Sequence, residues 1–318
     1  MNFLHVGYGK GGSSFLQKYY FIKDNGFLNL ARHPDWRAFI QDGLLTAQSI
    51  YFPSINCPPI PRQDGQNPLC IGVSEELFLG DGVDYRVKLE RWKAIFPETS
   101  VLIVTRNQLD IVYSGYCSHV PDGYYRSINR YLRELIWDAQ ATYFGSLFFD
   151  RAYEITKEYF DRVLVLPYEL MSSSDLFFEE INQFFDVTGR VPSLRVNASA
   201  NDTVLLVMRI LNFLFRHGRA RPQMTILPSY IIGSSRFDLN QVPGKEPSPV
   251  FRKQLNKIAT KIGRNIPIDR KTRQAFHNTH YHLFEEWFGE SNRRLQKMIN
   301  RDLSPYGYVG TIDRGNPQ

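Results

Sequence analysis

The sequence has few cysteines and no long apolar segment. Its 318 residues include three cysteines, Cys57, Cys70 and Cys117, which are odd in number and widely spaced. Such a set forms neither a disulfide framework nor a zinc-binding pattern. No apolar run approaches the ~18–20 residues of a membrane span, and the first run, Phe3 to Val6, is too short for a signal peptide. We therefore expect a cytoplasmic protein.

Internal repeats, low-complexity tracts and nucleic-acid-binding motifs are also missing, so neither a repeat array nor a nucleic-acid partner is indicated. Acidic residues are the scarcer charge, with 32 Asp and Glu against 38 Lys and Arg. This balance fits either an ordinary basic enzyme or an anionic ligand whose site is lined by cations. Hydrophobic residues make up 43% of the chain, which is enough for a large core.

Short apolar runs alternate with helical patterns along the first 185 residues. Strands separated by helices predict an α/β fold of three layers, α/β/α, with a central parallel sheet and ligand sites at the carboxyl ends of its strands. The last third reads as mainly helical. The expected strands are 3–7, 69–73, 101–105 and 162–168, and the expected helices include 13–21, 83–96, 109–117 and 176–185.

The stretch "GYGKGGSS", residues 7–14, follows the first expected strand directly and leads into a helix. Glycines there expose backbone N–H groups to an anion, and Lys10 adds a positive charge. The stretch is not a Walker motif, because Lys10 stands two glycines ahead of Ser13 and no aspartate follows a strand to complete a magnesium site. It indicates a phosphate held without metal; the alternative is a tight turn that binds nothing.

A second stretch, "VLIVTRNQLDIVYSGY", residues 101–116, brings Arg106 to the end of another expected strand. Ser114 follows eight residues later in an expected helix. Arginine suits fork-like recognition of a phosphate, and a serine hydroxyl can complete its shell. Alone, Arg106 would read as a surface ion pair. Together with the glycine loop, it indicates a nucleotide with two separate phosphates.

These stretches resemble motifs of the sulfotransferases that use 3′-phosphoadenosine 5′-phosphosulfate, especially their bacterial and carbohydrate-type branch. "GYGKGGSSFLQ" is similar to the 5′-phosphosulfate loop and "RNQLDIVYSGY" to the 3′-phosphate element. "RVLVLPYELMSSSDLFFEEINQFFDV" and "ESNRRLQKMINRDLSPYGY" resemble later segments of the family. Serines stand at 13 and 14 where threonine is commoner, and Gln108 stands where proline is usual; neither change removes a needed hydroxyl or charge.

The resemblance implies a P-loop-NTPase-like sulfotransferase fold in a single domain, residues 1–310. Its nucleotide-binding α/β core would occupy 1–190 and a mainly helical acceptor side 191–310, followed by a flexible tail, 311–318. The reaction implied is transfer of a sulfuryl group from 3′-phosphoadenosine 5′-phosphosulfate, without metal, to a hydroxyl of a glycan or glycolipid. The alternatives are a metal-independent nucleotide-binding transferase or kinase of related architecture, and a non-catalytic nucleotide-binding member.

The same resemblance assigns roles to the motif residues. Lys10 would stabilise the oxygen that the sulfuryl group leaves, as fixed charge does in phosphoryl transfer. Arg106 and Ser114 would hold the 3′-phosphate. The 5′-phosphate would be held by Gly9, Lys10, Gly11, Gly12, Ser13 and Ser14.

A base for the acceptor proton is expected in "LCIGVSEELF", residues 69–78, where two glutamates follow a strand. We expect Glu75 to be the base, with Glu76 and then His119 as alternatives. A second interpretation makes Ser74 a helix cap with the glutamates in the first turn. His5, inside the first strand, is expected to be a core residue.

Two further stretches have open interpretations. Residues 204–215 are apolar nearly all round, which fits a core helix, a dimer contact or a membrane-surface helix. Residues 251–264 are rich in Lys and Arg, which fits a solvated helix face or a wall for an anionic ligand.

Overall fold

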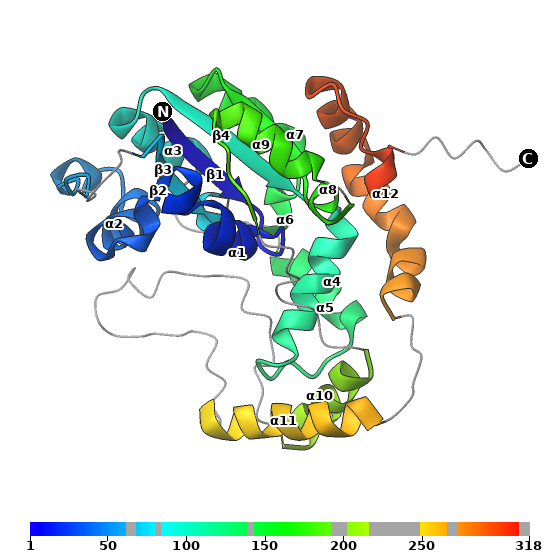
Figure 1. The fold of residues 1–318 in the computed structure, drawn as a ribbon. Helices are drawn as coiled ribbons and strands as arrows, with labels where there is room; N and C mark the ends of the chain where they lie inside the picture. The colour runs from blue at the N-terminus through cyan, green and yellow to red at the C-terminus, as the bar shows by residue number, and fades with distance from the viewer. Residues whose placement is uncertain are drawn as a thin grey trace, which may run out of the picture.

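The computed structural model describes residues 1–61, 68–79, 84–138, 143–173, 175–191, 202–215, 249–265 and 272–311. Within these ranges the chain forms one parallel sheet of five strands, in the order β2-β3-β1-β4-β5, with helices on both faces (Figure 1). This confirms the predicted α/β class. The strands are β1 Asn2–Gly7, β2 Phe27–Asn29, β3 Cys70–Glu75, β4 Thr99–Thr105 and β5 Val163–Pro167.

The strands alternate their side chains between two separate cores. Phe3 of β1 packs into the core beneath α9 Leu176–Phe185, and its neighbour Leu4 packs into the larger core on the other face. Leu102 and Ile103 of β4 divide in the same way. The continuous apolar runs seen in the sequence are therefore strands that are buried on both faces, as parallel strands usually are.

The register aligns the carboxyl ends of the central strands. Val6 of β1 pairs with Glu75 of β3 on one side and with Ile103 of β4 on the other. β5 continues the alignment, with Pro167 opposite the last residue of β4. The segments that follow β1, β3, β4 and β5 consequently emerge at the same edge of the sheet.

Helices cover this sheet unequally. The first face carries α1 Ser13–Phe15, the π-helix η1 Leu16–Tyr20, α8 Tyr168–Ser173 and α9, and the second carries the larger set. The other elements are η2 Lys23–Asn25, η3 Leu30–Arg32, α2 Pro34–Ala38, η4 Phe39–Leu44, η5 Phe52–Ser54, η6 Glu76–Phe78, α3 Tyr85–Ile95, α4 Gln108–His119, α5 Ile128–Asp138, α6 Tyr143–Ser146, α7 Phe149–Tyr159, α10 Asp202–Phe215, α11 Pro249–Asn265, α12 Thr272–Met298 and η7 Ser304–Tyr306.

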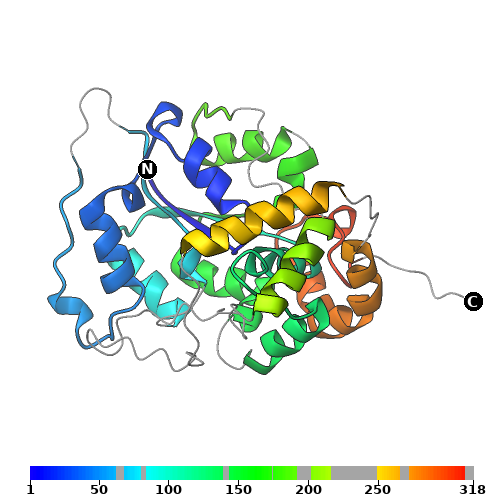
Figure 2. The ribbon, with the colours of Figure 1, turned by 90° about the horizontal axis from the view of Figure 1, so that it is seen from below.

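The C-terminal third is mainly helical over its described residues, as predicted. α12 runs back along the α/β core beside α4 and α7. α10 and α11 pack against each other beyond the end of α4, away from the sheet (Figures 1 and 2). The predicted tail lies outside the described residues except for Thr311.

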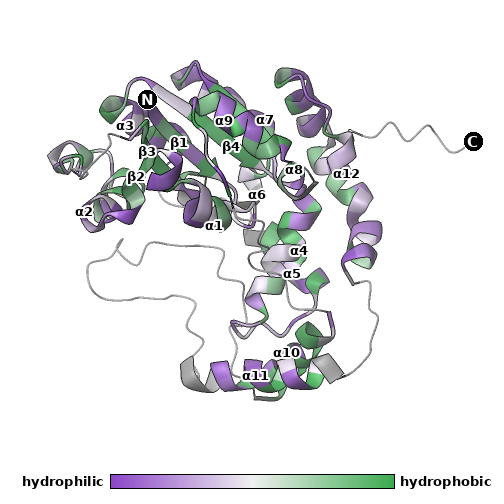
Figure 3. Cartoon of the chain, in the orientation of Figure 1, coloured by the Kyte–Doolittle hydropathy of each residue, from purple (hydrophilic) through white to green (hydrophobic). Residues whose placement is uncertain are grey.

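α10 is the helix whose environment the sequence left open. Val204, Leu205 and Met208 are buried, whereas Phe213 and Leu214 are exposed. In Figure 3 the hydrophobic colour of α10 lies beside the mixed colours of α11, whose described lysines are exposed. One side of α10 is thus core, and the cationic side of α11 is solvated. No helix in the described ranges is long and apolar enough to cross a membrane.

Two local features differ from the expected elements. The segment 13–21 is not one α-helix, because three α-helical residues lead into the π-helical turn η1. The strand β2, with Phe27 to Asn29, was not expected, because three residues are too few to show a periodicity.

Candidate functional site at the carboxyl edge of the sheet

The loop after β1 is a tight turn that enters the left-handed backbone region twice. The Gly11 N–H donates to the carbonyl oxygen of Tyr8 at 2.8 Å. The angle φ is 70° at Lys10 and 84° at Gly12. Such values cost a glycine little, but they are uncommon for a residue with a side chain. The exposed Lys10 therefore occupies a conformation that the closed loop imposes on it.

The two serines that follow the loop differ in exposure. Ser13 is buried against the end of β1, and a methyl group added at Gly7 would lie 2.0 Å from its Oγ. Ser14 is exposed. A ligand that approaches the loop from solvent therefore meets the Ser14 hydroxyl first.

Arg106 connects the glycine loop, residues 7–14, with the second predicted phosphate motif, residues 101–116. It follows β4, and its Nη1 donates a hydrogen bond to the Lys10 carbonyl oxygen. Its guanidinium carbon lies 4.6 Å from the centre of the Tyr168 ring. The same ring would be 2.7 Å from a methyl group added at Gly12. Tyr168 thus fills the space between the glycine loop and the Arg106 side chain.

The two candidate bases stand beside the loop, at the end of β3. Glu75 is the last residue of β3, and Glu76 begins the short helix η6. Burial raises the pKa of the Glu76 carboxyl, and the charge of Glu75 raises it further. The Lys10 ammonium and the Ser13 hydroxyl oppose this rise. Glu76 and Lys10 are therefore near enough to interact electrostatically.

The interpretation of Ser74 as a helix cap is wrong. Ser74 is a buried residue within β3, and its Oγ lies 2.7 Å from Nδ1 of His5. The prediction for His5 is confirmed: its ring stacks on Phe21, and burial lowers its pKa to about 3. His5 is therefore a neutral core residue at ordinary pH.

His119, the remaining candidate base, is the last residue of α4. Its ring packs on Tyr131, with the centroids 5.6 Å apart. A helix rises about 1.5 Å per residue, so the length of α4 separates His119 from the carboxyl edge of the sheet by roughly 16 Å. This distance makes Glu75 and Glu76 better placed beside Lys10.

Asn107 and Glu169 tie the Arg106 segment to its neighbours. The Asn107 N–H donates to Oε1 of Glu169 at 2.9 Å, and its side chain accepts from the Leu109 N–H at 2.9 Å, which caps α4. The Asn107 amide also donates to the Gly307 carbonyl. Burial raises the pKa of Glu169 to about 7, although the Asn107 N–H and the Arg106 charge lower it. Three parts of the chain therefore fix the start of α4.

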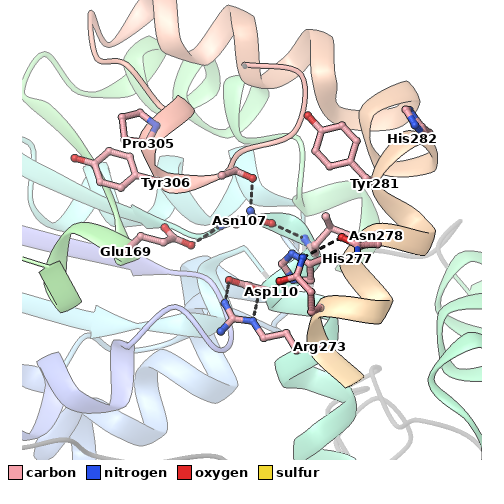
Figure 4. Close-up of a pocket in the computed structure, with 13 residues that line it drawn as sticks. Asn107, Asp110, Glu169, Arg273, His277, Asn278, Tyr281, His282, Pro305 and Tyr306 are labelled. Atoms are coloured by element: carbon pink, nitrogen blue, oxygen red, sulfur yellow. Dashed lines mark hydrogen bonds and ion pairs between the residues drawn. The ribbon is translucent and has the colours of Figure 1, made fainter. Parts of the chain in front are cut away.

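A pocket of about 780 Å³ opens next to this junction, between the start of α4 and α12 (Figure 4). Asp110, whose side chain is 7% exposed, accepts hydrogen bonds from Arg273 Nε and Nη2, the former at 2.8 Å. His277 Nε2 lies 2.8 Å from the same carboxylate. Burial raises the pKa of Asp110, but the bonds from His277 and Arg273 outweigh it and lower that pKa to about 2. The pocket is lined by Asn107, Leu109, Asp110, Glu169, Arg273, Gln274, His277, Asn278, Tyr281, His282, Pro305, Tyr306 and Gly307.

The structure assembles most, but not all, of the residues named from sequence. Lys10 and Glu76 interact, and Arg106 contacts the loop; the roles of these residues stay predictions. Ser114 is half-buried on α4, one turn beyond Asp110 and on the same helical face. Sequence reasoning missed Arg273 and His277. They stand in no local motif, and their spacing on α12 is an ordinary helical one.

Metal-ligating side chains do not gather at this edge. Across the described ranges, no group of three or more His, Cys, Asp or Glu side chains is arranged to hold a metal ion.

No family model matches the chain, and no curated protein matches it. Among solved structures, the chain is similar to a crystal structure of a sulfotransferase from Alicyclobacillus acidocaldarius, with 18% sequence identity and a TM-score of 0.42. The match covers 68% of this chain and 94% of the other. A similarity of this degree assigns no function.

Proposed function

We propose that the protein is a sulfotransferase that transfers a sulfuryl group from 3′-phosphoadenosine 5′-phosphosulfate to a hydroxyl group, with a glycan or glycolipid as acceptor. The observation that carries the proposal is the contact between Arg106 and the Lys10 carbonyl. It places a cation suited to one phosphate against a glycine loop suited to another. Two phosphate sites so close together fit a nucleotide that bears separate 3′ and 5′ groups.

The charge of Arg106 is available for a phosphate. Its guanidinium donates to a neutral carbonyl and stacks on Tyr168, and neither contact neutralises it; its charge also interacts with the buried Glu169 carboxyl, whose pKa is raised to about 7. In the proposal Arg106 and Ser114 hold the 3′-phosphate, and the loop of residues 9–14 holds the 5′ group through backbone N–H groups other than that of Gly11, which donates to Tyr8. Charge-assisted hydrogen bonds of this kind are about twice as strong as neutral ones.

In the transfer, the acceptor oxygen forms a bond to sulfur while the bond between sulfur and the bridging oxygen breaks. The electron pair of the broken bond stays on the bridging oxygen, where the Lys10 ammonium stabilises it. The hydroxyl proton passes to a carboxylate. From sequence we expected Glu75; the burial of Glu76 and its interaction with Lys10 support Glu76, and we propose it as the base. A raised pKa brings a carboxylate closer to the value that suits a base at neutral pH.

The first test is calorimetry with adenosine 3′,5′-bisphosphate and no magnesium. We expect micromolar binding, and much weaker binding of adenosine 5′-monophosphate, which lacks the 3′-phosphate. ATP binding, with no binding of the bisphosphate, would instead support a transferase or kinase of related architecture. Bisphosphate binding without sulfation of any acceptor would support a non-catalytic nucleotide-binding protein.

The acceptor is tested separately. The protein is incubated with the donor carrying a labelled sulfuryl group and with a cell extract, and the labelled product is identified. We expect the label on a sugar hydroxyl. Label found solely on a small phenol would contradict the glycan proposal and leave sulfuryl transfer intact.

A further inference from the structure

Neighbouring residues of the chain contact the glycine loop on one side and the pocket beside α4 on the other. Arg106 reaches the loop, and the next residue, Asn107, lines the pocket. After β5 the division repeats, because Tyr168 packs against the loop and Glu169 lines the pocket. The pocket is therefore a cavity at the same edge of the sheet, next to the proposed nucleotide site.

The charge of Asp110 is matched within the protein, and burial raises the pKa of the other lining carboxyl, Glu169, to about 7. Arg273 binds both carboxylate oxygens of Asp110, and His277 contacts one of them. A cation already paired in this two-pronged way offers little to a phosphate or sulfate, which would have to compete with a buried carboxylate. The lining thus disfavours an anionic ligand.

The rest of the lining offers ring surfaces and amide groups. Tyr281 of α12 and Tyr306 of η7 lie on opposite sides of the pocket, with Asn107 between them (Figure 4). On α12, the Gln274 amide donates to Oδ1 of Asn278 at 2.9 Å. This bond leaves the amide N–H groups of Asn278 and the amide oxygen of Gln274 for further partners. Aromatic faces cover the apolar C–H side of a sugar ring, and side-chain amides bind its hydroxyl groups.

We propose that this pocket binds an uncharged sugar, as a short oligosaccharide. Its volume of about 780 Å³ lies within the range of about 300–1,000 Å³ that is usual for small-molecule sites. The sugar rings pack against Tyr281 and Tyr306, and the hydroxyl groups bind Gln274 and Asn278. The proposal stands apart from sulfuryl transfer, because binding here needs no nucleotide.

Saturation-transfer NMR on the full chain without nucleotide tests this. The probes are glucose, galactose, N-acetylglucosamine, cellobiose and lactose, with glucose 6-phosphate as the charged counterpart of glucose. We expect millimolar binding of at least one uncharged sugar and weaker binding of the phosphate. The proposal would be overturned if no uncharged sugar shows saturation transfer from the protein, or if glucose 6-phosphate binds more tightly than glucose.

Variants locate the binding. Tyr281→Ala removes a ring, and Tyr281→Phe keeps it as a matched control. Because the Tyr281 hydroxyl also accepts a hydrogen bond from the Gly310 N–H, the double variant Gln274→Ala/Asn278→Ala changes exposed groups instead. Each lost hydrogen bond should weaken sugar binding roughly two- to tenfold. Thr279→Ala, at an exposed residue of α12 outside the lining, should change nothing. Sugar binding that survives both Tyr281→Ala and the double variant would place it elsewhere.

Discussion

The glycine-loop side and the pocket side of the sheet edge differ in what forms them: the backbone of one segment on the loop side, and side chains from distant parts of the chain on the pocket side. The loop side is made of consecutive backbone, with left-handed turns at Lys10 and Gly12. The pocket side is made of side chains, and its central pair, Asp110 and Arg273, is 163 residues apart in the chain. A site built from contiguous backbone carries a local sequence pattern, whereas a site built by packing distant helices does not.

The two glutamates on the loop side give the largest expected effect. Glu76→Gln should lower kcat by about 10²–10⁴, the usual contribution of a general base. Glu75→Gln removes the charge that raises the pKa of Glu76. That pKa should then fall, so the rise of rate with pH should move to lower pH. The pH profiles of both variants test this; an inactive Glu75→Gln beside an active Glu76→Gln would return the role of base to Glu75.

The charge of Lys10 comes next. Lys10→Ala should reduce kcat by about 10²–10³, since fixed charge at a transition state is worth roughly 3–4 kcal/mol. The affinity for adenosine 3′,5′-bisphosphate should change less, because the backbone donors of the loop remain. Steady-state kinetics and calorimetry measure the two quantities, with the exposed Lys18 replaced by alanine as control. A loss confined to nucleotide affinity would remove Lys10 from the chemistry.

Glu169, on the wall between the two sides, should make stability depend on pH. Its pKa is raised from 4.5 to about 7 in the folded protein. Its contribution to the free energy of unfolding is therefore full below about pH 4.5 and declines as pH rises through 7, by on the order of 3 kcal/mol. Glu169→Gln should lack this decline, because an amide oxygen still accepts the Asn107 N–H and carries no charge. Urea unfolding at pH 5 and pH 8 compares them; an equal decline in both proteins would contradict the assignment.

Arg106 and Ser114 should affect the nucleotide more than the fold. Arg106→Ala should weaken binding of adenosine 3′,5′-bisphosphate by about 1.5–3 kcal/mol, and Ser114→Ala by about 0.5–1.5 kcal/mol. Calorimetry measures both, and alanine at the exposed Arg133 of α5 is the control. An equal loss of thermal stability in the ligand-free protein, with unchanged affinity, would show that the two residues serve the fold.

The effect expected for Asp110 is also small, and it tests the pocket side of the sheet edge through the loss of stability at low pH. Its pKa is lowered from 3.8 to about 2, so the stability it contributes is present above about pH 4 and is lost as pH falls toward 2. We expect about 1–2 kcal/mol, because the side chain of Arg273 is 58% exposed and water screens the pair. Asp110→Asn should flatten this acid limb in unfolding experiments. If the variant loses stability at low pH as the unmodified protein does, that loss belongs to other carboxylates.

Much of the fold could be predicted because buried parallel strands leave a plain signal. The run Val101 to Thr105 is apolar and β-branched, and it forms most of β4. β2 gave no such signal, since tertiary pairing with β3 defines its three residues. The π-helical turn after Ser13 could not be predicted either, because its sequence fits an ordinary helix equally well.

The candidate site divides in the same way. Lys10 and Arg106 were recognisable because each stands at a fixed offset from a strand end. Glu169 follows β5 directly, but its bond to the Asn107 N–H depends on how β4 and β5 lie side by side in the sheet. His277 could not be found, because a helical histidine becomes informative once its carboxylate partner is known.

The left-handed backbone conformation at Lys10 lowers the stability of the fold, whereas the Lys10 side chain is needed for the proposed activity. Glycine would hold that conformation without the cost of about 1 kcal/mol that a side chain incurs there. The residue that the proposed reaction requires is consequently one that the fold alone would replace. A laboratory screen for heat resistance would enrich Lys10→Gly, and the selected proteins would be more stable but would lack the ammonium group that the proposed reaction uses.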